Sequence, residues 1–134
     1  MDWYLLACSA LLAVALAVNL LDRRMLLLTA VVGVGFYWPQ PMSSAAAFYV
    51  SCIFVEIVVG VSAFFLDHRR GFWVTEIALL LVLSHIMGFA LDGNPPFSPY
   101  HLIVKLLEFS QIAACVALSP VIAPILRNRD EATT

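Results

Sequence analysis

Residues 45–91 read AAAFYVSCIFVEIVVGVSAFFLDHRRGFWVTEIALLLVLSHIMGFAL, two long apolar runs separated by the short polar break 67–70. A helix that crosses the roughly 30 Å hydrocarbon core of a bilayer needs about 20 apolar residues, and each run has that length. The stretch therefore predicts a transmembrane helical hairpin whose turn carries two arginines, Arg69 and Arg70.

The composition of the whole chain favours the same class. Of its 134 residues, 63% are hydrophobic and 12% are charged, whereas a soluble domain has about 25% charged residues. The net charge of −2 provides no basic surface for nucleic acid, so no nucleic-acid partner is expected. The three cysteines lie in apolar runs without the spacing of a zinc site or a disulfide framework, so no metal or other cofactor is expected either.

Five segments are long or apolar enough to be predicted as crossings, and together they form an all-α, polytopic transmembrane helix bundle: Trp3–Leu21, Met25–Trp38, Ala45–Leu66, Phe72–Leu91 and Tyr100 to about Leu126. The first should remain as a helix rather than a cleaved signal peptide, because no basic segment precedes it. The second, about 21 Å long, is short enough to be re-entrant instead.

The arginines decide between these alternatives for the second segment. Six of the seven basic side chains lie in three polar breaks, as Arg23 with Arg24, Arg69 with Arg70, and Arg127 with Arg129. Lys and Arg accumulate on the cytoplasmic side of short loops. Five crossings place all three pairs on one side, whereas four would separate the first pair from the second. We therefore predict five spans, with the N-terminus outside and the C-terminus in the cytoplasm.

The predicted domain organisation is one transmembrane domain, residues 1–126, followed by a short, frayed cytoplasmic tail, residues 127–134. Pro120 and Pro124 interrupt the fifth segment, which predicts a helix that ends near Leu118 and continues as a bent piece at the interface. The longest outside loop, residues 92–99, is stiffened by prolines and is the best candidate for an external contact surface.

Polar groups at membrane depth are the main functional signal. An ionisable group in the hydrocarbon costs about 2.5–3.5 kcal/mol on insertion scales, so several in a small protein need an explanation. Counted at about 1.5 Å per residue from the cytoplasmic end, they lie at staggered heights on three segments. They predict a polar ladder across most of the membrane, with the members Glu56, Glu76, His85, Lys105, Glu108 and Gln111.

Two interpretations of the ladder remain open. In the first, Glu56 is a proton or cation site, which Glu76 connects to the cytoplasm and His85 with Glu108 connects to the outside. In the second, the same groups join helices within a protomer or between protomers. The spacing of Lys105 and Glu108 permits an ion pair on one helix face.

No catalytic motif is present, so an enzyme is not expected. We predict a small integral membrane protein of the bacterial inner membrane that forms a homo-oligomer or joins a membrane-protein partner, with a pore or an ion or proton pathway as the more specific hypothesis. One alternative is a phage holin-like, membrane-permeabilising protein, since the chain resembles holins in its size, its several spans and its charged tail. The other is a small proton-coupled exporter.

Overall fold

The computed structural model describes residues 2–41, 44–90 and 99–133, and every element in those ranges is a helix. In chain order the helices are α1 (Trp3–Val18), α2 (Arg23–Tyr37), α3 (Ala45–Leu66), α4 (Gly71–Ala90), α5 (Pro99–Ala117) and α6 (Ile122–Thr133). The predicted all-α class is confirmed. Residues 92–98 of the predicted contact loop lie outside the described residues, and Pro99 begins α5.

Polar side chains set several helix starts. Asp2, Asp22 and Ser44 precede α1, α2 and α3 and accept hydrogen bonds from backbone N–H groups of the first turn at 3.0–3.3 Å. Such caps satisfy N–H groups that have no partner inside the helix. At the start of α4, Gly71 lies so close to α3 that a methyl group there would overlap the carbonyl oxygen of Ala63. These residues fix tight connections between neighbouring helices.

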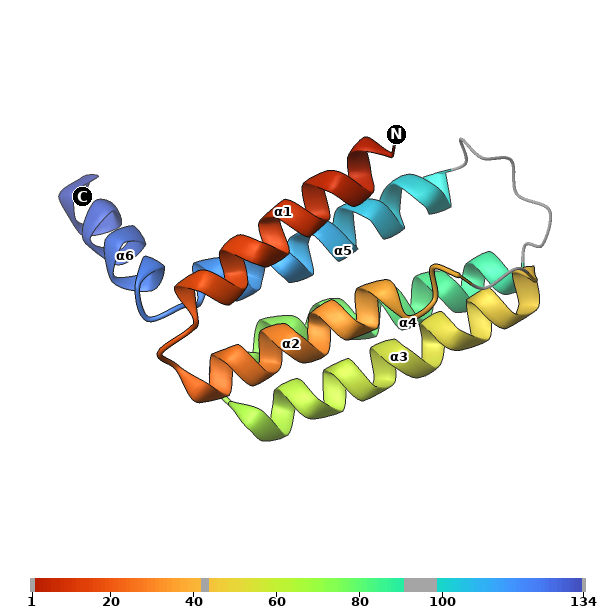
Figure 1. Ribbon diagram of the computed structural model, residues 1–134, viewed down its shortest axis with the longest axis horizontal. Coiled ribbons are helices and arrows are strands. Elements are labelled where there is room, and N and C mark those ends of the chain that lie inside the picture. The colour runs from red at the N-terminus through yellow and green to blue at the C-terminus, as the bar shows by residue number, and fades with distance from the viewer. Residues whose placement is uncertain (1, 42–43, 91–98, 134) are drawn as a thin grey trace.

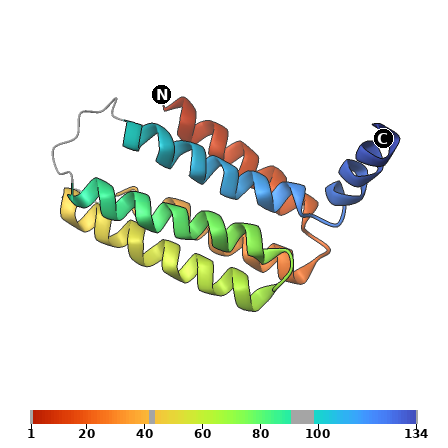
Figure 2. The ribbon, with the colours of Figure 1, turned by 180° about the vertical axis from the view of Figure 1, so that it is seen from behind.

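The five long helices form a bundle of two layers (Figure 1). One layer contains α1 and α5, which pack side by side, and the other contains α2, α3 and α4. The opposite view shows α4 and α5 in front of α2 and α1 (Figure 2). The turns from α1 to α2 and from α3 to α4 lie at the same end of the bundle as α6. The three arginine pairs therefore gather at one end, which we call the arginine end.

The helix α6 corrects one expectation. The fifth segment does break near Leu118, as its prolines predict, because α5 ends at Ala117. The chain after Arg127, however, is helical rather than frayed, since α6 continues to Thr133. Ser119 begins this helix by accepting a hydrogen bond from the N–H of Ile122 at 3.0 Å. Ser119 is thus the N-cap of α6.

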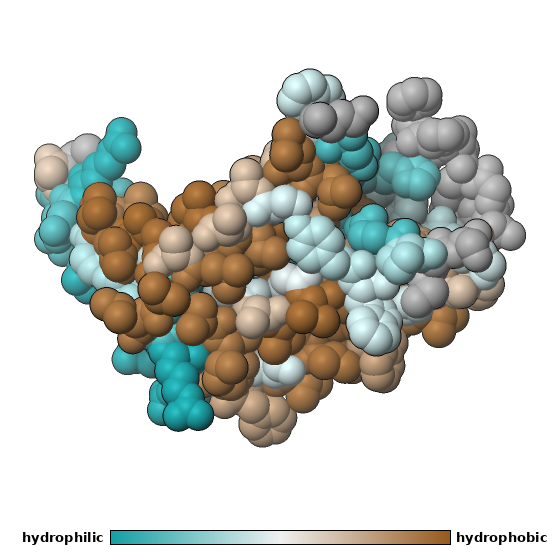
Figure 3. Space-filling view, viewed as in Figure 1, coloured by the Kyte–Doolittle hydropathy of each residue, from teal (hydrophilic) through white to brown (hydrophobic). Residues whose placement is uncertain are grey.

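The bundle exposes large apolar side chains and buries polar ones. Phe65 is 80% exposed and Met87 is 62% exposed, whereas Glu56 is 6% exposed and His85 is 1% exposed. Figure 3 shows hydrophobic residues over most of the visible face between the two ends. Three helices, α3, α4 and α5, are long and apolar enough to cross a membrane, and α1 is a shorter apolar helix. This distribution is that of a protein whose sides contact lipid.

Candidate functional site

The first residues to place are the members of the predicted ladder that lie on α5. Its buried member is Gln111, which is 4% exposed, while Glu108 is half-buried and Lys105 is exposed. His101 is half-buried one turn before Lys105. Because these positions are separated by three or four residues, they lie along one side of the helix.

Three side-chain hydrogen bonds join this helix to three others. Gln111 Nε2 on α5 donates to Glu56 Oε2 on α3 at 3.1 Å. The Tyr4 hydroxyl on α1 donates to Glu108 Oε2 at 2.5 Å. On α4, His85 Nδ1 lies 2.9 Å from the Tyr100 hydroxyl. The sequence suggested contacts among these helices, but neither tyrosine was predicted to take part.

The Tyr100 contact depends on a small residue in α4. A methyl group at Gly88 would overlap the Tyr100 ring, so glycine makes room for that ring against the helix. The phenol can then reach His85, one turn earlier on the same face of α4. A histidine followed one turn later by a glycine is too common a pattern to predict such a contact from sequence.

The spacing of Lys105 and Glu108 permits an ion pair, but the two side chains have other partners in the structure. Glu108 accepts from Tyr4 instead. The ammonium of Lys105 lies over the Tyr4 ring, 5.4 Å from its centroid. A neighbouring helix therefore provides partners for both side chains.

Glu76 lies apart from the other members of the predicted ladder. Glu76 is exposed, while the face of α4 that packs into the bundle carries Val74, Ala78 and His85. A residue two positions from Val74 lies about 200° around the helix from it, so Glu76 points out of the bundle. Within one protomer, Glu76 therefore does not connect Glu56 to the arginine end.

A polar cavity of about 460 Å³ opens at the end of the bundle opposite the arginines. It lies among the first turns of α1, α3 and α5 and the residues that follow α2. Its lining combines charged, hydroxyl and aromatic side chains, and we call it the polar cavity: Asp2, Tyr4, Gln40, Ser44, Ala45, Phe48, Tyr49, Tyr100, His101, Val104, Lys105 and Glu108. Its volume is within the range of small-molecule sites.

A second polar cluster, not predicted from the sequence, joins α1, α2 and α5 toward the arginine end. Asn19 is fully buried, and its Nδ2 donates to the carbonyl oxygens of Ala15 and Cys115 at 2.8 and 2.9 Å and to Thr29 Oγ1 at 3.2 Å. Asn19 Oδ1 is buried without a hydrogen-bond partner among the described residues. One side chain thus holds three helices together.

The arginine end contains an ion-pair cluster that joins two turns, and we call it the Arg70 clamp. The guanidinium of Arg70 lies 2.5 Å from Asp22 and 2.7 Å from Asp67; Asp67 is buried, and Asp22 and Arg70 are half-buried. Hydrogen bonding to Arg70 holds the pKa of Asp22 below its ordinary value. Burial alone would raise the pKa of Asp67, but hydrogen bonds from Arg70 outweigh burial and lower it. The clamp ties the α1–α2 turn to the α3–α4 turn.

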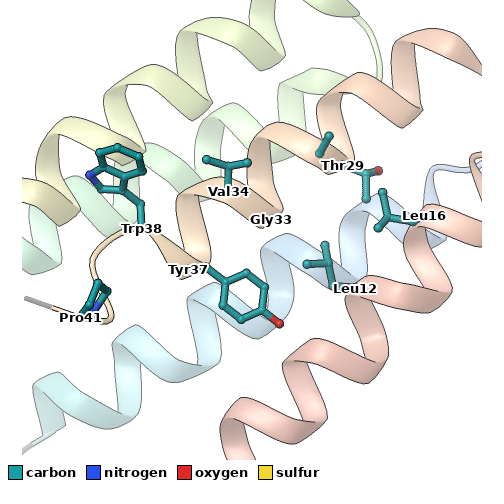
Figure 4. A pocket seen from close by; sticks show the side chains of 9 residues that line it. Leu12, Leu16, Thr29, Gly33, Val34, Tyr37, Trp38 and Pro41 are labelled. Atoms are coloured by element: carbon teal, nitrogen blue, oxygen red, sulfur yellow. The ribbon is translucent and has the colours of Figure 1, made fainter.

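A groove of about 560 Å³ between α1 and α2 is the contrasting apolar hollow (Figure 4). Leu12, Leu16 and Val34 are among its lining side chains, and the Tyr37 hydroxyl is hydrogen-bonded to Ser9. The groove lies on the side of the bundle, where lipid chains would fill it. Its lining has no charged side chain, and it is not part of the candidate site.

In residues 2–41, 44–90 and 99–133, no group of three or more His, Cys, Asp or Glu side chains is placed to hold a metal ion. A comparison with protein-family models, with curated proteins and with solved structures finds no match. The function is therefore argued from the polar cavity and the groups beneath it.

Proposed function

We propose that this is a small integral inner-membrane protein with five crossings, whose polar cavity is the outer half of an ion or proton pathway. The observation that carries the proposal is the cavity itself, which contains Glu108 in its wall and opens opposite the arginine end. By the positive-inside rule, the arginine end would be cytoplasmic and the cavity would face outside.

The next group along the pathway would be Glu56. Gln111, which holds Glu56, lies three residues after Glu108 on the same side of α5. Two carboxyl groups would then follow one another from the cavity into the bundle, each with a hydrogen-bond donor that can shift when a proton or cation arrives. An ionisable side chain inside the membrane is a functional hypothesis by default, because its burial is costly.

The inner half of the pathway would need assembly of several copies. Beyond Gln111, buried apolar side chains that include Leu28, Val59 and Ile112 fill the core of the single chain. A closed homo-oligomer is the usual way for a small bundle to enclose a continuous path.

Flux into liposomes tests the proposal. Wild-type protein and the Glu56→Gln and Glu108→Gln variants are reconstituted, and proton or cation entry is followed with an internal dye. Both substitutions keep a hydrogen-bond acceptor but remove the titratable group, so each should reduce flux at least about tenfold. Glu76→Gln is the matched control and should conduct normally. Equal flux in wild type and Glu56→Gln would refute the pathway.

A structural role is the second candidate function, and a specific observation favours it. The hydrogen bonds of Glu56 and Glu108 are made within one chain and join α5 to α3 and α1. The protein would then be an accessory subunit, held in a larger membrane complex by its apolar sides. Absence of flux in wild type, together with lower melting temperatures for the two variants, would support this role over the first.

A further inference from the structure

We propose that the polar cavity binds a small organic cation that has both an ammonium group and an aromatic or alkyl part. The cavity contains two acidic side chains, Asp2 and Glu108, beside one lysine, Lys105. Such a lining attracts positive charge. This proposal concerns binding alone, so it can hold or fail independently of ion flux.

The second observation is a row of aromatic rings along one wall. Tyr49 lies between Phe48 and Tyr100, with ring centroids 5.9 Å from each, and Tyr100 is followed by His101 at 5.1 Å. Aromatic rings present a negative face to a cation and a large apolar surface to the rest of a ligand. The row comes from α3 and α5, so both helices would contact the ligand.

The third observation is that the cavity already holds an ammonium group. Lys105 Nζ lies over the Tyr4 ring at 5.4 Å, within the distance of a cation–π contact. The hydroxyl of the same Tyr4 donates to Glu108. Lys105 therefore occupies a position where aromatic ring and carboxyl group lie together, as an external ammonium ligand would.

Because Lys105 already lies over Tyr4, we expect its ammonium group to compete with a cationic ligand. Lys105 is exposed and carried on a flexible side chain, so a ligand can displace it from Tyr4 at modest cost. While it stays, its charge opposes the binding of another cation. Removing that charge should strengthen ligand binding, whereas removing Glu108 should weaken it. A purely structural Lys105 would not give this opposite pair of effects.

The experiment is calorimetric titration of the full chain in nanodiscs of zwitterionic lipid, with benzyltrimethylammonium as the probe and empty nanodiscs as the baseline. We expect saturable binding of one probe per chain. Lys105→Met should bind about three- to tenfold more tightly, and Glu108→Gln at least about tenfold more weakly. Benzyl alcohol and benzenesulfonate, which are neutral and anionic, should bind far less.

Two control variants sharpen the result. Lys105→Arg keeps the resident cation and should retain wild-type affinity within about twofold. Glu76→Gln removes a carboxylate that does not line the cavity and should leave affinity unchanged. The proposal is overturned if neither wild type nor Lys105→Met binds beyond the baseline, if Lys105→Met binds no more tightly than wild type, or if benzenesulfonate binds as well. The Lys105 variants decide the matter even if Glu108→Gln does not fold.

Discussion

Charged side chains form ion pairs at the arginine end of the bundle and line a cavity at the other end. At the arginine end, Arg70 is held by two carboxylates, and the three side chains tie two turns together. At the other end, Asp2, Lys105 and Glu108 surround an open cavity, and none of them forms an ion pair with another described residue. A closed ion-pair cluster stabilises a fold, whereas charges left around a cavity remain available to a ligand or an ion.

The largest expected effect on stability comes from removing the central side chain of the Arg70 clamp. Arg70→Ala leaves Asp22 and Asp67 close together without their shared partner, so the free energy of unfolding should fall by about 2–4 kcal/mol. The measurement is unfolding of purified protein in mixed micelles, followed by circular dichroism. Arg69→Ala is the matched control, because Arg69 is exposed and should change stability by less than about 0.5 kcal/mol. Equal losses for both variants would contradict the clamp.

The buried cluster near the same end should give the next largest effect. Asn19→Ala removes the amide N–H groups that reach Thr29 in α2 and Cys115 in α5, in addition to the bond to Ala15 within α1. Interhelical hydrogen bonds in membrane proteins average about 0.6 kcal/mol, and the lost side chain also leaves a small cavity, so we expect a loss of about 1–2 kcal/mol. Leu20→Ala, at an exposed neighbouring position, should cost much less in the same unfolding assay.

Acid should reduce the stability that the Arg70 clamp contributes. Hydrogen bonding to Arg70 lowers the pKa of Asp22 from its ordinary 3.8, and the pKa of Asp67 is also lowered. Both stabilising contributions are therefore fully present above about pH 4 and are lost as pH falls through the lowered values. Melting temperatures measured between pH 7 and pH 3 should decrease more steeply at the acid end for wild type than for Arg70→Ala. Parallel curves would show that the carboxylates are not linked to folding through Arg70.

The sequence was most informative about the course of the backbone. The apolar runs predicted α3 with the bounds that the structure has, and the prolines predicted the break after α5. Apolar length and helix-breaking residues are local properties, so they can be identified without knowing the fold. The number of crossings and their direction stay predictions, since they depend on the membrane as well as on the chain.

The sequence was least informative about which polar groups meet. Spacing along α5 suggested that Lys105 would pair with Glu108, but the partner is Tyr4, whose position depends on how α1 is rotated against α5. Glu76 lies in a helix that is apolar on all sides, so no periodicity indicated which way it points. The Arg70 clamp joins residues 48 positions apart, a distance at which helical periodicity carries no information.

The smallest expected effect on stability is at the polar cavity, and it tests most directly whether the two ends of the bundle differ. Tyr4→Phe removes the hydroxyl that donates to Glu108 but keeps the ring under Lys105. If the polar cavity serves binding rather than stability, the free energy of unfolding should fall by about 0.6 kcal/mol, the average for interhelical hydrogen bonds in membrane proteins. A double-mutant cycle with Glu108→Ala isolates the coupling between the two side chains. A coupling as large as the loss in Arg70→Ala would mean that the cavity end is also a structural clamp, because the hydroxyl would then hold α1 against α5 as firmly as Arg70 holds the two turns.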